Sequence, residues 1–470
     1  MSASWKSVFL ETAKPSTAKI KQNHSLFRCV RASSLRRIGQ PKYSNTREDG
    51  VLRSYAMRLM WWKRHIALAG LIMSTLVAME VTTGRLFVGH LTAQPLTDNT
   101  PPAALRDLGT VRTDVQYPQG FFIPAYFALD QQNKNELNQK FDLIVAPRWV
   151  DVSGISSEKT LIMTAPSPCN SNSLGDRNEW NEINQHEDWF LHSSPTPSSD
   201  TRIPMSGYTH LFYMDVGSQG WKDFVVSKYQ KVIEDNPAVD GVFVDGPTDI
   251  DGYESLLGSA YPVYSASEYE AKALDFISAI KSAVGPNKLV ILNANLEKSF
   301  TARADGNMAE GFVHFGGWEN GRQATKEQWL SDIRGISGPE SDEKYLLVGS
   351  GSLESTLPSM VEYCYASFLI AYNTNAHCYF YWHSNAEGGY STINWFSLWE
   401  LKIGEPLGDY VESSGLYRRN FTEGVALVNP NDVGEAKAVS LDGFYLNSVG
   451  SVVTSVILSN KSGVVLKKIE

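Results

Sequence analysis

The sequence Val-Asp-Gly-Val-Phe-Val-Asp-Gly occupies residues 239–246 and predicts a buried strand that ends in a carboxylate. The three residues before Asp245 are apolar without alternation, as in a parallel strand covered on both faces. Gly246 and Pro247 then end the strand. In barrel enzymes the catalytic groups lie at this carboxyl-terminal end of the strands, so Asp245 is the first candidate for catalysis. An aspartate that caps the following loop or helix is the alternative.

Short apolar runs alternate with helical stretches on both sides of this strand, which is typical of a parallel α/β sheet. Strands are expected at 121–127, 141–146, 160–165, 211–216, 241–245, 288–293, 311–315, 345–349 and 376–382. Helices are expected at 130–140, 220–235, 266–284 and 357–372. Eight or nine strands in roughly 270 residues predict a (β/α)8 TIM barrel over residues 119–405. A doubly wound open sheet is the alternative, but no glycine-rich phosphate loop follows the first strand.

The pattern changes in two places. Residues 166–206 are long and irregular, and such a loop in a compact domain is usually functional or a lid. Short strands separated by Gly, Asn and Asp turns follow the barrel, at 425–430, 438–441 and 452–458. The fold class expected is therefore α/β, a TIM barrel with a small C-terminal antiparallel β domain over residues 406–470.

The net charge of −9 hides two unlike parts of the chain. Residues 1–64 carry 14 of the 42 Lys and Arg but only 3 of the 51 Asp and Glu, so the remaining residues hold 28 basic and 48 acidic side chains. A body this acidic argues against a nucleic-acid partner. Residues 1–64 are basic and rich in Ser, with little periodic hydrophobicity, so we expect them to be disordered. A mitochondrial-type presequence is the alternative.

An uncharged apolar run, Ile66–Met79, follows Lys63 and Arg64. It is shorter than the roughly 20 residues that span a bilayer, and it fits the apolar region of a signal peptide. Because apolar residues resume at 86–88, we expect residues 65–91 to be a signal peptide or a membrane anchor. Residues 92–118 follow as a linker, and positive charge ahead of the run predicts a secreted or anchored barrel outside the cytoplasm. A start at Met57 or Met60 would place this segment at the N-terminus.

Several other chemistries find little support in the sequence. The four cysteines, Cys29, Cys169, Cys364 and Cys378, match no zinc motif, and the last two either pair or are buried free thiols. The nine His show no His-Glu-x-x-His pattern, so no metal or other cofactor is expected. The run Gly-Ser-Gly-Ser at 349–352 lacks the Gly-x-Ser-x-Gly spacing of a nucleophilic serine.

Carboxylates near strand ends are the informative set. Asp245 is the clearest, Glu310 lies where the strand expected at 311–315 begins, and Glu319 lies beyond its far end. Asp215 lies at or near the end of the 211–216 run. Two carboxylates that face one cleft are the minimum for glycoside hydrolysis, in which one protonates the leaving oxygen and the other attacks or activates water. Any one of them alone is more often a solvated loop residue.

Neutral side chains accompany these acids. Asn293 and Asn295 end one strand, and asparagine can hold sugar hydroxyls or orient a carboxylate. Aromatic and histidine side chains at strand ends could form stacking platforms for sugars, although such residues more often pack in the core. The candidate substrate-binding residues are Asp215, Asn293, Asn295, Trp149, Trp318, Trp382 and His383.

Six segments carry a family resemblance. They are Phe-Asp-Leu-Ile-Val (141–145), Trp-Phe-Leu-His (189–192), Tyr-Met-Asp-Val-Gly (213–217), Asp-Gly-Val-Phe-Val-Asp-Gly (240–246), Ala-Glu-Gly-Phe (309–312) and Tyr-Arg-Arg-Asn-Phe-Thr-Glu-Gly-Val-Ala-Leu-Val-Asn-Pro (417–430). In this order they resemble the hypothetical glycosyl hydrolase family 15 and its polygalactosaminidase-like relatives, over residues 120–470. The resemblance implies a TIM barrel in which Asp245 follows the fourth strand and Glu310 lies at the sixth. Members often carry a second acid directly after the fourth-strand Asp, where this chain has Gly246.

The sequence therefore predicts a glycosidase that acts on an extracellular or cell-surface polysaccharide or oligosaccharide. Asp245 would be the nucleophile or base and Glu310 the general acid, with Glu319 in reserve. The alternative is a catalytically inactive barrel that binds glycan and takes part in exopolysaccharide assembly. Contact with a membrane is expected only through residues 65–91 if they are not cleaved, and the oligomeric state stays open.

Overall fold

The computed structural model describes residues 117–122, 129–205, 208–246, 256, 259–315, 322–352, 357–384 and 393–469. All of them belong to one unit of the chain, Thr100–Glu470. The expected N-terminal tail at 1–64, the segment 65–91, nearly all of the linker 92–118 and Cys29 lie outside the described residues. Within those residues no helix is long and apolar enough to cross a membrane.

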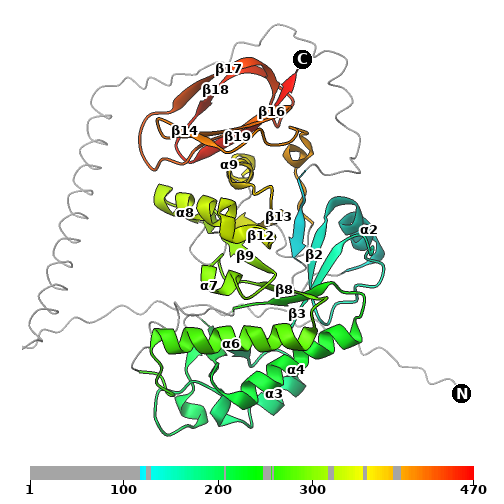
Figure 1. Cartoon of the computed structure of the whole chain (residues 1–470), viewed down its shortest axis with the longest axis vertical. Helices are drawn as coiled ribbons and strands as arrows, with labels where there is room; N and C mark the ends of the chain where they lie inside the picture. Colours follow the sequence, from blue (N-terminus) through cyan, green and yellow to red (C-terminus); the bar gives the residue numbers. More distant parts are fainter. Residues whose placement is uncertain are drawn as a thin grey trace, which may run out of the picture. The chain divides into compact units, whose positions relative to one another are not determined.

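Eight parallel strands form the central sheet (Figure 1). They are β1 (Gly120–Phe122), β2 (Leu143–Pro147), β3 (Thr160–Thr164), β7 (Gly241–Val244), β8 (Leu289–Leu292), β9 (Gly306–Glu310), β12 (Tyr345–Ser352) and β13 (His377–Ser384). Each strand pairs with the next in this order. A parallel bridge between Gln119 and Phe380 joins the two edges of the sheet. The chain therefore folds as a TIM barrel.

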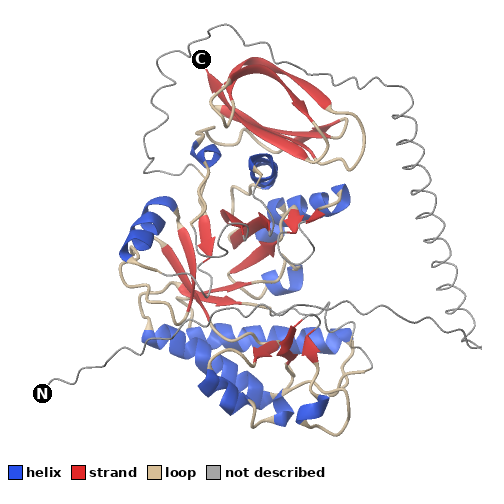
Figure 2. Cartoon of the chain, turned by 180° about the vertical axis from the view of Figure 1, so that it is seen from behind, coloured by secondary structure: helices blue, strands red, loops and turns tan. Residues whose placement is uncertain are grey.

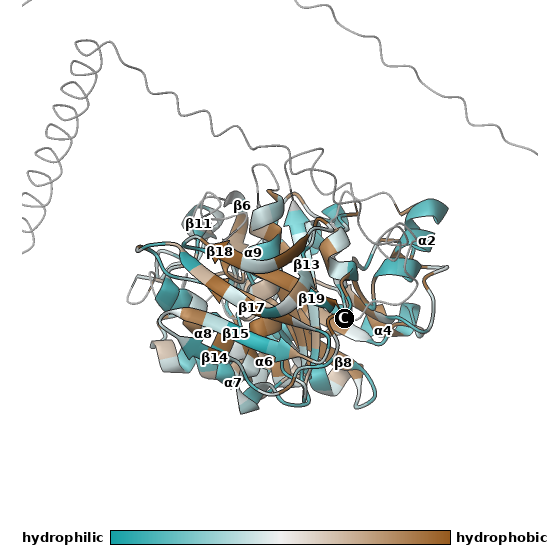
Figure 3. Ribbon diagram, turned by 90° about the horizontal axis from the view of Figure 1, so that it is seen from above, coloured by the Kyte–Doolittle hydropathy of each residue, from teal (hydrophilic) through white to brown (hydrophobic). Residues whose placement is uncertain are grey.

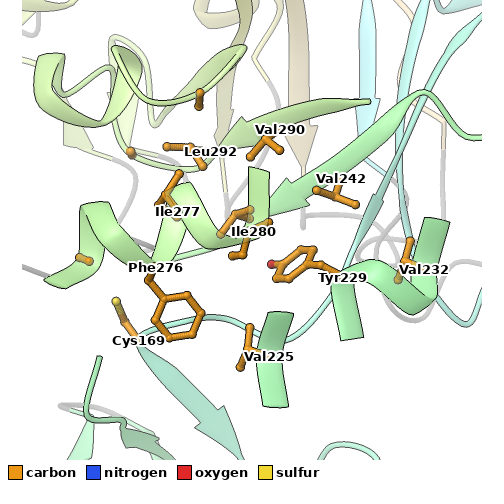
Figure 4. Packing of buried hydrophobic residues seen from close by; sticks show 14 of the residues in the cluster. Cys169, Val225, Tyr229, Val232, Val242, Phe276, Ile277, Ile280, Val290 and Leu292 are labelled. Carbon is orange, nitrogen blue, oxygen red and sulfur yellow. The ribbon is translucent and has the colours of Figure 1, made fainter. Parts of the chain in front are cut away.

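The strands form where apolar residues run without alternation, because both faces of the barrel sheet are covered. All residues of β2 and β7 are buried. Alternate side chains point into the barrel, where Val145, Phe243, Ile291 and Leu347 pack in one cluster. The other side chains face the surrounding helices, as Figure 4 shows for Val242, which lies above the ring of Tyr229.

Helices connect most of the strands. They are α2 (Gln131–Lys140), α4 (Gln219–Asp235), α6 (Ala266–Val284), α7 (Lys298–Thr301), α8 (Lys326–Ser337) and α9 (Pro358–Ala371), with the 3-10 helices η4 (Pro339–Ser341) and η6 (Ser397–Glu400). α6 begins at a capping box of Ser265 and Glu268, and α8 begins at one of Thr325 and Gln328. α4 and α6 pack side by side over β7 and β8 (Figure 1). The connection from β2 to β3, residues 148–159, contains no helix.

The long segment between β3 and α4 builds a small substructure of its own. It contains β4 (Asn170–Asn172), α3 (Arg177–Ile183), η2 (Glu187–Trp189), η3 (Ser199–Thr201), β5 (Pro204–Met205) and β6 (Tyr208–Tyr213). The three strands form an antiparallel sheet in the order β4-β6-β5. The expected barrel strand at 211–216 is therefore wrong, because this apolar run pairs with Asn170–Asn172 instead of with the barrel.

The sixth barrel strand also differs from the expectation. The strand expected at 311–315 is replaced by β9, which ends at Glu310. Only β10 (His314–Phe315) remains of the expected strand, and it pairs antiparallel with β11 (Arg322–Gln323). β9 carries a single large apolar residue, Met308, so periodicity did not identify it. Glu310 is consequently the last residue of β9, whereas the sequence pattern predicts it just before a strand at 311–315.

The C-terminal residues form a six-stranded antiparallel sheet (Figure 2). Its strands are β14 (Val411–Ser413), β15 (Leu416–Phe421), β16 (Gly424–Asn429), β17 (Lys437–Leu446), β18 (Val452–Leu458) and β19 (Ser462–Ile469). α9 packs against β16 and β19, and Arg419 of β15 donates to carbonyls at the end of α9. Figure 3 shows hydrophobic residues concentrated in the interior, while the outer helix α2 is largely hydrophilic.

The three cysteines of the body are free and buried. Cys364 lies on α9 and Cys378 on β13, and they form no disulfide. Burial raises the pKa of both thiols to about 12, so neither is a thiolate at neutral pH. Of the two expectations for Cys364 and Cys378, the structure confirms buried free thiols.

Candidate active site

Three neighbouring barrel strands end in polar residues at the same edge of the sheet. Asp245 follows β7, Asn293 follows β8, and Glu310 is the last residue of β9. β7 pairs with β8 and β8 with β9, all parallel, and the backbone N–H of Asn293 donates to Val244. These are the fourth, fifth and sixth strands of the barrel. The three side chains therefore meet at the carboxyl-terminal end of the barrel, where such enzymes keep their chemistry.

Asn293 joins the two acids. Its Nδ2 atom donates to Oδ1 of Asp245 at 3.0 Å and to Oε2 of Glu310 at 2.6 Å. Both oxygens accept from the same nitrogen atom. The distance between Oδ1 of Asp245 and Oε2 of Glu310 therefore cannot exceed about 5.6 Å. Asp245 and Glu310 are exposed, so solvent reaches both carboxylates. The structure thus brings together three of the residues that the sequence pointed to.

A second asparagine holds the end of β9 in place. The side chain of Asn295 accepts a hydrogen bond from the backbone N–H of Glu310 at 3.1 Å. Asn295 and Leu296 both adopt left-handed backbone angles, with φ of 44° and 60°. Asparagine tolerates this region better than other residues with a side chain, so it suits a tight exit from β8. Asn295 therefore fixes the backbone of Glu310 by accepting its N–H.

Buried Asn307 holds the chain where it leaves β8, although the sequence pattern does not single this residue out. Its Oδ1 accepts from the backbone N–H of Ala294 at 2.9 Å, and its Nδ2 donates to Thr301 at 2.7 Å. An amide with no exposed surface is stable only when its hydrogen bonds are made. An asparagine between Gly306 and Met308, inside a barrel strand, was the available signal.

Left-handed backbone also follows β7 and β9. Gly246 has a φ of 57° and Gly311 a φ of 74°. Glycine adopts these angles without strain, which gives a physical reason for glycine at both positions. Val313 has a φ of 62°, which is a strained value for a β-branched residue. Its N–H donates to the half-buried Asp332 at 3.0 Å, and burial raises the pKa of this carboxyl to about 6.

Tyr229 of α4 is buried near the end of β7, and its hydroxyl donates to the carbonyl of Phe243 at 3.5 Å. Desolvation raises the pKa of Tyr229 well above its usual value, and the nearby charge of Asp245 acts in the same direction. Arg148, just after β2, opposes this shift and forms an ion pair with Glu179 of α3. The neutral phenol of Tyr229 and the cation of Arg148 therefore belong to the surroundings of Asp245, although the sequence pattern singled out neither.

Asp215 occupies a different environment from the acid pair. It follows β6 of the small antiparallel sheet and is buried, and its Oδ1 accepts from the N–H of Gly217 at 2.8 Å and from the hydroxyl of Tyr264 at 3.0 Å. Burial raises the pKa of this carboxyl, and the two hydrogen bonds counter the shift. These contacts give Asp215 a buried, hydrogen-bonded position, and its role in binding substrate stays a prediction.

The aromatic candidates divide by exposure. Trp149, two residues beyond β2, is 65% exposed and is free to stack on a sugar. Trp382 is only 4% exposed and packs among the residues between β13 and the surrounding helices, so the expectation of a stacking platform there is corrected. Its neighbour His383 is half-buried. Trp318 and Glu319 lie outside the described residues.

Among residues that the structure describes, no three His, Cys, Asp or Glu gather as metal ligands. The site offers two close, solvent-accessible carboxyl groups that are joined by a neutral amide donor. Such a pair can divide the roles of proton donor and nucleophile or base.

The family model described as hypothetical glycosyl hydrolase family 15 matches residues 159–425, which include the strands that carry Asp245, Asn293 and Glu310. No curated protein matches the sequence.

Solved structures similar to this chain include three glycan-related proteins. The glycoside hydrolase domain of PelA from Pseudomonas aeruginosa is 11% identical, with a TM-score of 0.39 over 60% of this chain and 100% of that one. Ega3 of Aspergillus fumigatus, in complex with galactosamine, is 10% identical, with a TM-score of 0.39 over 58% and 94%. The α-amylase of Geobacillus thermoleovorans, complexed with acarbose, is 11% identical, with a TM-score of 0.41 over 76% and 99%.

Proposed function

The chain belongs to the hypothetical glycosyl hydrolase family 15, and we propose that it is a glycoside hydrolase that cleaves an extracellular or cell-surface polysaccharide with Asp245 and Glu310. The observation that carries this proposal is the acid pair joined by Asn293 at the ends of the fourth, fifth and sixth barrel strands. The family alone does not name the catalytic residues. The geometry supplies two carboxylates at a distance that glycoside hydrolysis can use.

The separation of the carboxylates favours retention of configuration. Retaining glycosidases hold their carboxyl groups about 5–5.5 Å apart, whereas inverting enzymes leave about 6.5–9.5 Å for a water molecule. The facing oxygens of the two groups, both bonded to Asn293, are at most about 5.6 Å apart, and this closeness supports the first class. We therefore assign the nucleophile to Asp245 and the acid and base to Glu310.

In the first step, an oxygen of Asp245 attacks the anomeric carbon while the bond from this carbon to the glycosidic oxygen breaks. Glu310 gives its proton to the departing oxygen. In the second step, the Glu310 carboxylate takes a proton from water, whose oxygen displaces Asp245 from the anomeric carbon. Asn293 stays neutral throughout and holds both carboxyl groups in place by donating to them.

The surroundings support a large, uncharged or cationic glycan. The acid pair is exposed, and Trp149 offers a flat apolar surface after β2. The strong excess of acidic side chains outside residues 1–64 disfavours a polyanionic substrate. The extracellular location in this proposal rests on the charge and length of the 65–91 segment.

Release of reducing ends from a panel of neutral, amino-sugar and uronic-acid polysaccharides tests the proposal. We expect the wild type to cleave at least one neutral or amino-sugar polymer. The variant Glu310→Gln should lose about 100-fold or more of this rate, and the matched change Glu319→Gln should retain it within about threefold. Loss in Glu319→Gln alone would transfer the acid role to that residue. Binding of a glycan without cleavage of any polymer would support the inactive, glycan-binding barrel instead.

The stereochemistry of the first product provides a separate check. Proton NMR recorded during the first turnovers distinguishes the two anomers before they interconvert. A retaining mechanism predicts that the first product keeps the anomeric configuration of the substrate. A first product of opposite configuration would contradict the assignment of Asp245 as nucleophile.

A further inference from the structure

The interior face of β12 carries a glycine beside the acid pair. Glu310 of β9, Gly349 of β12 and Tyr381 of β13 lie in register across three neighbouring strands. Two residues earlier, Met308, Leu347 and Tyr379 lie in the same register and pack together inside the barrel. Because side chains alternate along a strand, Glu310, Gly349 and Tyr381 face the same interior one layer nearer the active-site end.

Gly349 leaves room for the ring of Tyr381. A Cβ atom at position 349 would lie 2.4 Å from Cε1, Cζ and Oη of this tyrosine, far closer than atoms can approach. The ring therefore crosses the backbone of β12 toward β9, where its hydroxyl donates a long hydrogen bond to the sulfur of Met308 at 4.0 Å, and a thioether is only a weak acceptor. Gly349 therefore shapes the barrel interior by leaving space for the Tyr381 ring.

The strand order then puts Glu310 between two polar side chains. β8, which carries Asn293, lies on one side of β9, and β12, which the Tyr381 ring crosses, lies on the other. Met308 and Glu310 lie two residues apart on the same face of β9, which is about 6.6 Å along the strand, so a phenol that contacts Met308 lies one layer below Glu310. The amide of Asn293 already bonds Oε2 of this residue from the opposite side.

We propose that Tyr381 is a positioning residue for Glu310, with its hydroxyl holding the carboxyl group on the side away from Asn293, and that Gly349 is the clearance which this arrangement requires. The role as a positioning residue for the acid and base rests on the proposed function. A phenol O–H donated to a carboxylate stabilises the ionised form, which Glu310 needs when it takes a proton from water. The phenol also restricts the side-chain angles of Glu310.

The titration of Glu310 tests this inference without any substrate. Glutamate labelled with ¹³C at the carboxyl carbon reports each pKa by NMR, and Glu310→Gln identifies the signal. Tyr381→Phe should raise the pKa of Glu310 by about half a unit or more, because a donor to the charged form is lost. The matched control is Tyr379→Phe, which removes a phenol from the same strand one layer deeper and should leave the titration unchanged.

A second variant moves the ring while keeping its hydroxyl. Gly349→Ala should shift the Glu310 titration in the same direction, and the double variant with Tyr381→Phe should add little to the single changes. Where the wild type cleaves a glycan, the corresponding limb of its pH–rate profile should shift with the NMR titration. If the wild type cleaves no glycan, the proposed function fails. The NMR titration still shows whether the Tyr381 hydroxyl bonds Glu310. A Glu310 titration in folded Tyr381→Phe that matches the wild type would overturn the inference.

Discussion

Asn293 is the residue on which the site depends, because its one amide group lies between two carboxyl groups and bonds both. It donates to Asp245 and to Glu310, and these bonds connect the end of β7 with the end of β9. Two carboxylates this close repel each other when both are ionised. A neutral donor between them lowers this cost and allows the acid and the nucleophile to differ in protonation.

Replacement of Asn293 tests this reading. We expect Asn293→Ala to lower kcat by about 10–100-fold, because both carboxyl groups lose a donor that orients them. Asn293→Asp keeps the size but adds a third carboxylate, so the acidic limb of the pH–rate profile should move upward. Steady-state kinetics across pH 4–9 measure both effects. Unchanged profiles in both variants would show that the amide does not act on the pair.

Asp332 makes a pH-dependent contribution to stability. The pKa of its carboxyl is raised from 3.8 to about 6 because it is desolvated near Val313. The folded state therefore binds this proton more tightly than the unfolded state, so the contribution is complete below about pH 4 and is lost as pH rises toward 6. Asp332→Asn keeps an acceptor for Val313 and removes the charge. Urea unfolding should show a gain of about 1–2 kcal/mol at pH 7 and none at pH 3.5. A loss of stability at pH 7 would contradict this account.

At the scale of elements, glycines at strand starts let the barrel strands approach closely. A Cβ atom on Gly306, the first residue of β9, would lie 2.2 Å from the carbonyl oxygen of Tyr345 on β12. Backbone atoms in a closed barrel have no room to move aside. The position of Glu310 at the other end of β9 therefore depends on this close pairing.

We expect Gly306→Ala to lower the free energy of unfolding by more than about 2 kcal/mol, because the added methyl group forces β9 away from β12. Gly443→Ala in β17 is the matched control, since the nearest atom to its added Cβ is Cε of Lys468 at 3.7 Å. This control should change stability by less than about 0.5 kcal/mol. Equal effects of the two substitutions in urea unfolding would contradict the packing argument.

The elements that sequence predicted well are those with strong local signals. The helix expected at 266–284 matches α6 because a capping box precedes a regular apolar stripe. β9 escaped prediction because its sequence, Gly-Asn-Met-Ala-Glu, has no apolar run. The run at 211–216 is apolar, but local sequence cannot tell which sheet a strand joins. Asp245, Asn293 and Glu310 were found at strand ends, whereas the place of Tyr381 depends on the register of three strands and on a glycine between them.

At the scale of the whole molecule, the barrel and the C-terminal sheet share the helix α9. This helix is apolar on all sides, with Tyr363 and Ala366 lying against Gly463 of β19. Nη1 of Arg419 donates to the carbonyls of Leu369, Ile370 and Tyr372 at 3.2, 3.1 and 2.6 Å. The sheet therefore covers a barrel helix and satisfies its last carbonyl groups.

Arg419→Met should lower the free energy of unfolding by about 2–4 kcal/mol, because buried carbonyls lose their donor. Its neighbour Arg418 faces the other side of β15 and bonds Asn420 at 2.7 Å in an exposed position, so Arg418→Met is the matched control and should cost under about 0.5 kcal/mol. Urea unfolding followed by tryptophan fluorescence measures both. Equal losses would argue against the contact between Arg419 and α9 as a major source of stability.

The central claim is that Asp245 and Glu310 act together as the catalytic pair of a glycoside hydrolase. The most direct measurement is the initial rate of reducing-end release by Asp245→Asn beside the wild type, on a polysaccharide that the wild type cleaves. We predict a loss of about 1000-fold or more with the fold unchanged, because the amide keeps the shape of the side chain and removes the nucleophile. Cleavage by Asp245→Asn at the wild-type rate would contradict the account.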